Sequence, residues 1–181
     1  MRGATAVLAS VSTVVLSAAV LAADHQVIYV VRHAERAAST PQPALPPNAP
    51  GGHGMMIADD PPLSPAGQAR AARLATMLGS ADIKRIYTTE FKRTRQTGAP
   101  LADKLRITPV MAAAKDPAPL VKQLQQGTGN ALVVGHSDTI PDLLKKLGVK
   151  DTVTIADDQY DDLFIVIRRV GEPSTLIRLK Y

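Results

Sequence analysis

The residues of this chain whose types and positions could do chemistry are two histidines and the arginines near them. His33 lies in the segment Arg-His-Ala-Glu-Arg at residues 32–36, between two arginines. His136 lies in Gly-His-Ser, and Arg93 lies in a third segment between the two histidines. Imidazole can act as a nucleophile or carry a proton, and guanidinium groups bind phosphate oxygens through paired N–H donors. These residues therefore indicate a site for an anion, and phosphate suits them.

The histidines and Arg93 follow stretches that have the pattern of buried strands. Residues 27–31, 83–87 and 131–134 are short apolar runs rich in β-branched side chains, as is typical of strands. In an open α/β sheet, ligands bind at the carboxyl ends of the strands. Because right-handed crossovers bring these ends to one edge of a sheet, we expect the two histidines and Arg93 to meet there.

Helix signals alternate with the strands. Ser64-Pro65 and Asp116-Pro117 each place a capping residue before a proline, which predicts a helix start. A helix that begins near Phe91 is expected to kink or divide at Gly98 and Pro100. The other predicted elements are a helix after residue 139 and strands at 107–111, 163–167 and 176–179. This alternation predicts a three-layer, doubly wound α/β fold with a mainly parallel sheet and an antiparallel pair at its end.

The first 23 residues resemble a secretory leader. Arg2 precedes an uncharged run of apolar and small residues at 4–21, and small residues then offer a cleavage site. A transmembrane anchor is the alternative, but it requires about 20 strongly apolar residues, and serine and threonine dilute this run. We expect a signal peptide over 1–23, export to the periplasm or medium, no stable membrane insertion after cleavage, and one catalytic domain over 24–181.

The composition limits the kinds of molecule and metal ion that this protein is expected to bind. The chain has no cysteine, which excludes disulfides and zinc–thiolate sites. Its charge is +5, but it has only two Phe, four Tyr and no Trp to stack on bases, so nucleic-acid binding is disfavoured. A phosphorylated small molecule or a phosphoprotein fits the charge better. We expect no cofactor and no metal, because the histidines at 25, 33, 53 and 136 show no recurring ligand spacing.

Four motifs in one order resemble the histidine phosphatase superfamily, which includes the phosphoglycerate mutases and the histidine acid phosphatases. Arg-His-Ala-Glu at 32–35 is similar to the family's Arg-His-Gly, with Ala34 in place of glycine. Leu-Ser-Pro-Ala-Gly at 63–67 is similar to its Leu-Ser/Thr-x-x-Gly helix start. Thr-Thr-x-x-x-Arg-x-x-Gln-Thr, in 87–97, is similar to its Ser-Ser-x-x-x-Arg-x-x-Gln-Thr segment, and 133–137 resembles the block around its second histidine.

The resemblance implies a phosphoglycerate mutase-like fold and a role for each polar residue. His33 would attack phosphorus and form a phosphohistidine intermediate. Arg32, Arg36, Arg93 and His136 would hold the phosphoryl oxygens, with His136 as a hydrogen-bond donor. Water would then release phosphate, and this chemistry requires no metal or cofactor.

The proton donor for the leaving group is left open. The mutase branch has a glutamate well after the second arginine, and residues 105–117 hold no clean counterpart. Asp138 follows His136 by two residues and is either this acid or the N-cap of the next helix. Glu35 and Glu90 are weaker candidates.

One further residue and one segment have open interpretations. Arg36 either binds phosphate or forms a salt bridge with Glu35 or Asp60. Residues 39–62 form a Pro/Gly-rich loop that either covers the site or stays unengaged. Acidic residues at 157, 158, 161 and 162 are interpreted as a solvated turn.

The sequence thus predicts an exported, metal-independent phosphatase acting on phosphate monoesters or phosphohistidine. A mutase-like phosphotransferase is one alternative. A non-catalytic phosphate-binding protein is another, because no acid is evident.

Overall fold

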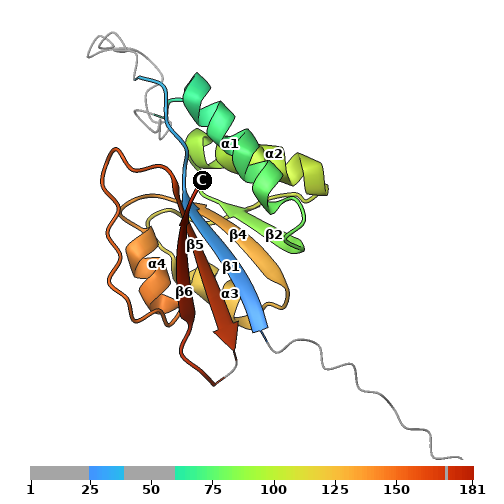
Figure 1. Ribbon diagram of the computed structural model, residues 1–181, viewed down its shortest axis with the longest axis vertical. Helices are drawn as coiled ribbons and strands as arrows, with labels where there is room; N and C mark the ends of the chain where they lie inside the picture. Colours follow the sequence, from blue (N-terminus) through green and yellow to red (C-terminus); the bar gives the residue numbers. More distant parts are fainter. Residues whose placement is uncertain (1–24, 39–59, 170) are drawn as a thin grey trace, which may run out of the picture.

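The computed structural model describes residues 25–38, 60–169 and 171–181 (Figure 1). Strands in these residues form one sheet in the order β3-β2-β4-β1-β5-β6. Neighbours among β1 to β4 are parallel, whereas β5 pairs antiparallel with β1 and β6. The strands are β1 (His25–Arg32), β2 (Ile83–Thr88), β3 (Val110–Met111), β4 (Asn130–Gly135), β5 (Asp162–Arg169) and β6 (Thr175–Lys180). The predicted mainly parallel α/β sheet with an antiparallel end is confirmed.

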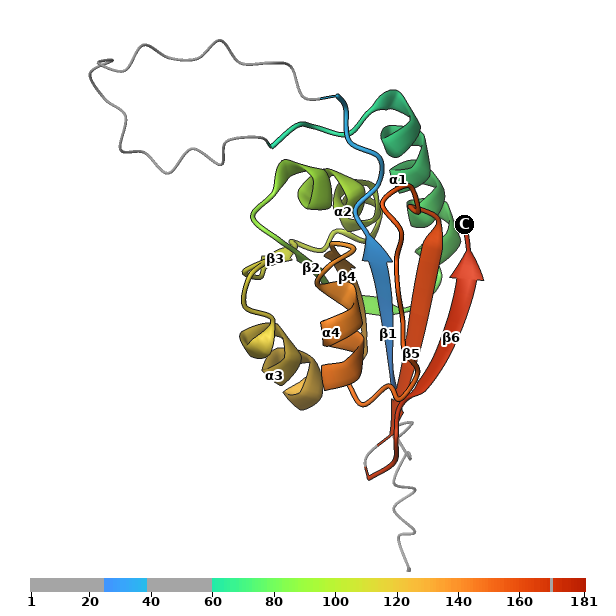
Figure 2. The ribbon, with the colours of Figure 1, turned by 90° about the vertical axis from the view of Figure 1, so that its left-hand side faces the viewer.

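Helices cover both faces of the sheet (Figures 1 and 2). They are α1 (Pro65–Leu78), α2 (Lys92–Leu105), α3 (Ala118–Gln126) and α4 (Ile140–Lys146). Successive strand residues point to opposite faces, so Val31 packs in a core with α1 and α2 while Val30 packs in a second core with α3 and α4. The burial of both faces explains why β1 and β4 are nearly continuous apolar runs.

The start of α1 is fixed against the segment that follows β1. Ser64 is the N-cap, its side chain accepts a hydrogen bond from Gly67 N at 3.1 Å, and Pro65 is the first helical residue, as predicted. Ser64 N donates to Glu35 O at 2.9 Å. A Cβ on Gly67 would collide with the Glu35 carbonyl, so this close approach requires glycine there. The Leu-Ser-x-x-Gly motif therefore docks α1 beside His33.

Two predictions about elements are wrong in part. α2 is not divided at Gly98 and Pro100 but runs continuously over Lys92–Leu105, because its side chains beyond the proline, Leu101 and Ala102, pack into the core. Tertiary packing here outweighs the helix-breaking tendency of proline. The third strand covers Val110–Met111 only, because its pairing with β2 is limited to two residues.

The expected signal peptide (1–23) and most of the expected loop (39–62) lie outside the described residues. In the described ranges, no helix is long and apolar enough to span a membrane.

Candidate active site

The two histidines come together at the carboxyl ends of adjacent parallel strands. Arg32 pairs with Gly135 across β1 and β4, and His33 N donates to Gly135 O at 2.9 Å. The rings of His33 and His136 have centroids 5.3 Å apart and planes at 64°. The strand register thus brings together residues about a hundred positions apart in sequence.

The His33 ring is buried and held in one tautomer. Its Nδ1 lies 2.8 Å from Ala34 O, and a carbonyl can only accept, so Nδ1 carries the proton and Nε2 carries the lone pair. Burial, together with smaller effects of His136, Arg93 and Arg32, lowers the pKa of His33 to about 3. His33 is therefore a neutral imidazole whose Nε2 can act as a nucleophile.

His136 is held by two threonines. Its Nε2 lies 3.0 Å from Thr89 Oγ1, which lies 2.9 Å from Thr94 Oγ1. Burial and then the charge of Arg93 lower the pKa of His136 to about 4. Sequence reasoning did not assign a role to either threonine, although Thr89 falls in the Thr-Thr pair that matches the family's Ser-Ser. These hydroxyls orient the His136 ring.

The Arg32 guanidinium is buried and held by a turn from the far end of the chain. Nη1 donates to Ala156 O, Asp157 O and Gln159 O at 2.9–3.1 Å. Cζ lies 4.1 Å from the centre of the Tyr160 ring. Asp157 and Asp158 are exposed in a turn, as predicted, whereas Asp162 is buried, and backbone carbonyls of this segment bind Arg32.

Arg93 enters from the start of α2. Its Cζ lies 4.1 Å from the centre of the Phe91 ring, and Nη1 lies 3.5 Å from Asp60 Oδ1. The Asp60 carboxylate also accepts from Lys92 N at 2.9 and 3.0 Å, which caps a helix whose N-cap, Phe91, has no capping side chain. The sequence analysis names Asp60 only as a possible salt-bridge partner of Arg36. Its contact with Arg93 could not be found from spacing.

A part of the chain that contains some of these site residues is similar to a known protein family. The family description "Histidine phosphatase superfamily (branch 1)" matches residues 28–115, which contain Arg32, His33 and Arg93. The match spans a little under half of the chain, so residues 28–115 are similar to this superfamily. A search of curated proteins gave no match.

Solved structures share the histidine phosphatase fold. The protein histidine phosphatase SixA complexed with tungstate is 17% identical, over 85% of this chain and 96% of that one, with a TM-score of 0.62. Mycobacterial hydrolase 1 is 13% identical, over 87% and 99%, with a TM-score of 0.64. Mycobacterial glucosyl-3-phosphoglycerate phosphatase is 14% identical, over 87% and 98%, with a TM-score of 0.59. At these identities the likeness concerns the fold.

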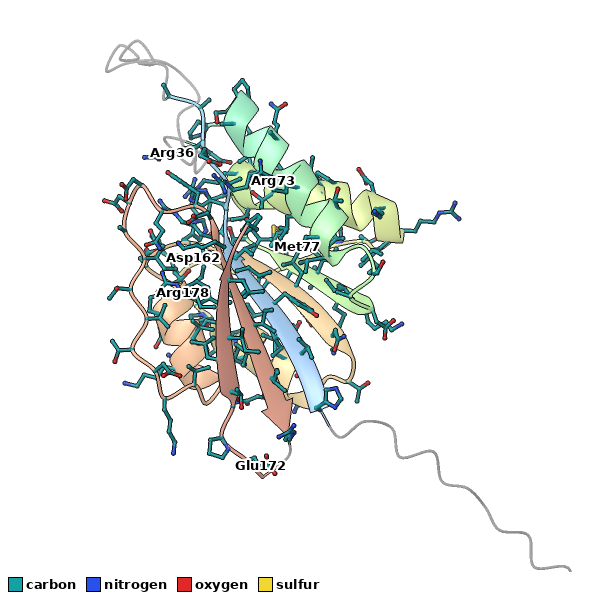
Figure 3. The ribbon with its side chains drawn as sticks, in the orientation of Figure 1. Arg36, Arg73, Met77, Asp162, Glu172 and Arg178 are labelled. Carbon is teal, nitrogen blue, oxygen red and sulfur yellow. The ribbon has the colours of Figure 1, made fainter. Side chains whose placement is uncertain are left out.

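Arg36 lies outside the buried group of site residues. Its side chain is exposed (Figure 3), and its backbone bridges to Leu63. Both carboxylates considered as its partners contact other arginines: Glu35 binds Arg70 at 2.6–3.0 Å, and Asp60 contacts Arg93. A phosphate-binding role for Arg36 remains a prediction.

The three candidate acids differ in their surroundings. Hydrogen bonds from Arg70 hold the pKa of Glu35 below its usual range, so it stays ionised. Glu90 Oε2 accepts from Ala114 N at 3.0 Å. Asp138 is exposed and lines a cleft of about 410 Å³ with Arg93 and His136. Asp138 is therefore the candidate placed where a leaving group could lie.

The alternative role of Asp138 as a helix cap is wrong. The N-cap of α4 is Thr139, whose Oγ1 accepts from His136 N at 3.3 Å. Among the described residues, no group of three or more His, Cys, Asp and Glu is arranged to hold a metal ion. His25 begins β1, at the opposite end of that strand from His33, and His53 lies outside the described residues.

Proposed function

We propose that this protein is a phosphatase that hydrolyses phosphate monoesters or phosphohistidine through a covalent phosphohistidine on His33. The observation that carries the proposal is the buried, neutral His33, whose Nδ1–H is bound to Ala34 O while Arg32, Arg93 and His136 lie around it. A fixed tautomer beside guanidinium donors meets the two needs of phosphoryl transfer, which are positioning and charge stabilisation.

The reaction proceeds in two steps. Nε2 of His33 attacks phosphorus, the bond from phosphorus to the leaving group breaks, and the electron pair goes to the leaving group. Arg32 and Arg93 bind the phosphoryl oxygens and offset their charge. A bound phosphoryl dianion raises the pKa of His136 from about 4, which favours its role as a hydrogen-bond donor. Water then attacks the phosphorus of the phosphohistidine and the bond from phosphorus to Nε2 breaks. Phosphate is released, and neutral His33 is regenerated.

The nature of the leaving group follows from the acids that are present. None of the three candidate acids is buried: Glu35 and Glu90 are half-buried and Asp138 is exposed. Leaving groups that need little protonation, such as an aryl oxide or the imidazole of phosphohistidine, are therefore the preferred substrates. With the leader predicted over residues 1–23, we place this activity outside the cytoplasm, in the periplasm or medium.

The test is hydrolysis of p-nitrophenyl phosphate by wild type, His33→Ala and His25→Ala. We expect loss of the nucleophile to lower kcat by about 10³-fold or more. His25→Ala should match wild type because that exposed histidine begins β1. Wild type should also yield an acid-labile, base-stable phosphoprotein that His33→Ala does not form.

Equally slow phosphate release by wild type and His33→Ala would overturn the enzyme proposal. Phosphate binding without turnover would then favour the alternative of a non-catalytic phosphate-binding protein.

A second measurement tests Asp138 as the acid. If Asp138 protonates the leaving group, Asp138→Asn should slow hydrolysis of an alkyl phosphate by about 10²-fold but barely affect p-nitrophenyl phosphate. Asp142→Asn is the matched control, since Asp142 lines the same cleft but is paired with Lys146. Equal effects on both substrates would exclude Asp138 from this role.

A further inference from the structure

We infer that Tyr160, with the turn 156–159, is a positioning residue that aims one edge of the Arg32 guanidinium at the phosphoryl group. This inference rests on the proposed function, because it assigns how a group of that same site is held. Nothing in the motifs points to it, since the family match ends at residue 115.

The first observation is that the turn uses up one nitrogen of Arg32. Nη1 has two hydrogens, and Ala156 O, Asp157 O and Gln159 O all lie within 3.1 Å of it. Three acceptors around two hydrogens leave Nη1 no capacity for a ligand. The turn therefore fixes the rotation of the guanidinium in its own plane.

The second observation concerns the opposite edge. Arg32 Nε is buried and has no hydrogen-bond partner among the described residues. The same Nε–Nη2 edge in Arg70 and Arg178 grips a carboxylate, of Glu35 and Asp162 respectively. A buried N–H without a partner is destabilising, and an anionic oxygen would remove that cost. The geometry thus presents the Nε–Nη2 edge of Arg32 to a phosphoryl oxygen.

The third observation is the Tyr160 ring. It stacks on the Arg32 guanidinium at 4.1 Å, and its centroid lies 6.0 Å from that of His33. The His33 ring therefore has Tyr160 and His136 as ring neighbours. An aromatic face holds the plane of a guanidinium without neutralising its charge. The turn sets the in-plane rotation, and Tyr160 sets the tilt.

The turn is itself anchored at both ends. Ala156 N donates to Gln159 Oε1 at 3.2 Å, and Gln159 N donates to Ala156 O at 3.0 Å, which closes the loop on itself. Two residues after Tyr160, the buried Asp162 is bound by Arg178 at 2.7 and 2.8 Å, and the two side chains lie together in Figure 3. A segment tied in this way can hold Arg32 in one orientation.

The experiment measures inorganic phosphate binding by calorimetry and the kinetics of p-nitrophenyl phosphate for Tyr160→Leu and Tyr160→Phe. Leucine keeps an apolar contact but has no aromatic face. We expect Tyr160→Leu to weaken phosphate binding and raise KM about tenfold, as one cation–π contact of 1–2 kcal/mol would. Tyr160→Phe should stay within about twofold of wild type, because it retains the stacked ring.

A double-mutant cycle with Arg32→Lys shows whether Tyr160 acts through Arg32. The inference requires that Tyr160→Leu has little further effect once Arg32 is lysine. It is overturned if Tyr160→Leu weakens phosphate binding equally in both backgrounds, or not at all. Should Tyr160→Leu fail to fold, as judged by circular dichroism, Tyr160→Met takes its place under the same criteria. Phosphate binding is read without turnover, so an inactive wild type would refute the proposed function and leave this test intact.

Discussion

Arg32 and Arg93 contribute guanidinium groups to the same site but are held in opposite ways. Each has an aromatic ring stacked at 4.1 Å, Tyr160 for Arg32 and Phe91 for Arg93. The oxygen neighbours differ. Arg32 donates to neutral backbone carbonyls, whereas Arg93 lies 3.5 Å from the Asp60 carboxylate. The comparison shows that stacking can hold either group in place while the choice of acceptor decides how much positive charge is left for a ligand.

That difference predicts unequal contributions to phosphate binding. Neutral carbonyls orient Arg32 without cancelling its charge, so its full charge can act on the phosphoryl group. The Asp60 carboxylate offsets part of the Arg93 charge. It also caps α2 through Lys92 N, which ties the position of Arg93 to the helix start.

The largest expected effect comes from replacing each arginine by lysine. Lysine keeps the charge but loses the planar fork and the stacking. We expect Arg32→Lys to lower kcat/KM for p-nitrophenyl phosphate by about 10²–10³-fold, the loss typical of a donor that stabilises the transition state. Arg93→Lys should cost about tenfold less, since Asp60 already offsets part of its charge. Equal losses of kcat/KM in the two variants would show that the hydrogen-bond acceptors of the two arginines do not affect how strongly each acts on the phosphoryl group.

The two histidines beside these arginines predict how stability depends on pH. Their folded pKa values, about 3 for His33 and about 4 for His136, lie below the ordinary 6.5, so the unfolded chain binds more protons between these values. Stability should therefore be full above about pH 6.5 and fall as pH drops toward 3–4, by up to about 1.4 kcal/mol per pH unit for each histidine.

Urea unfolding from pH 7 to pH 4 measures this slope. His33→Asn and His136→Asn should each flatten it, whereas His25→Asn should not, because that residue is exposed. An unchanged slope in both site variants would contradict the low pKa values.

A smaller effect is expected from Asp60→Asn. Asparagine still accepts from Lys92 N but removes the negative charge beside Arg93. Phosphate should then inhibit about fivefold more strongly, for a charge effect on the order of 1 kcal/mol. Asp103→Asn, exposed near the other end of α2, is the matched control. Weaker inhibition would instead mean that Asp60 is needed to place Arg93.

The smallest effect on activity is expected from Glu35→Gln. Glu35 is directly bonded to Arg70, which keeps its pKa low, so it should be no proton donor and turnover should change by about twofold at most. Stability should fall by about 1 kcal/mol at neutral pH because this half-buried pair is lost. That difference in stability is present above pH 4.5, the ordinary pKa of a glutamate carboxyl, and disappears as pH falls through the lower folded pKa of Glu35. Denaturant melts at pH 7 and pH 3 check it.

Much of the fold could be predicted because its signals are local. The β1 and β4 runs, the Ser64-Pro65 start of α1 and the closing β5–β6 pair all match the structure. Of the predicted kink or division of α2, the division is wrong, because a proline within the helix is tolerated where the residues after it are buried. The prediction that Asp138 caps α4 is also wrong, since the N-cap is Thr139, whose hydroxyl accepts a hydrogen bond from His136 N.

The sequence alone determined which residues meet at the site, because His33, Arg93 and His136 follow strands whose carboxyl ends a parallel sheet must align. The tertiary structure alone decided what holds them. The carbonyls that bind Arg32 lie 124 to 127 residues away in sequence, and Asp60 reaches Arg93 from outside its helix. Backbone carbonyls are the same in every residue, so no pattern of side chains marks the ones that will hold an arginine.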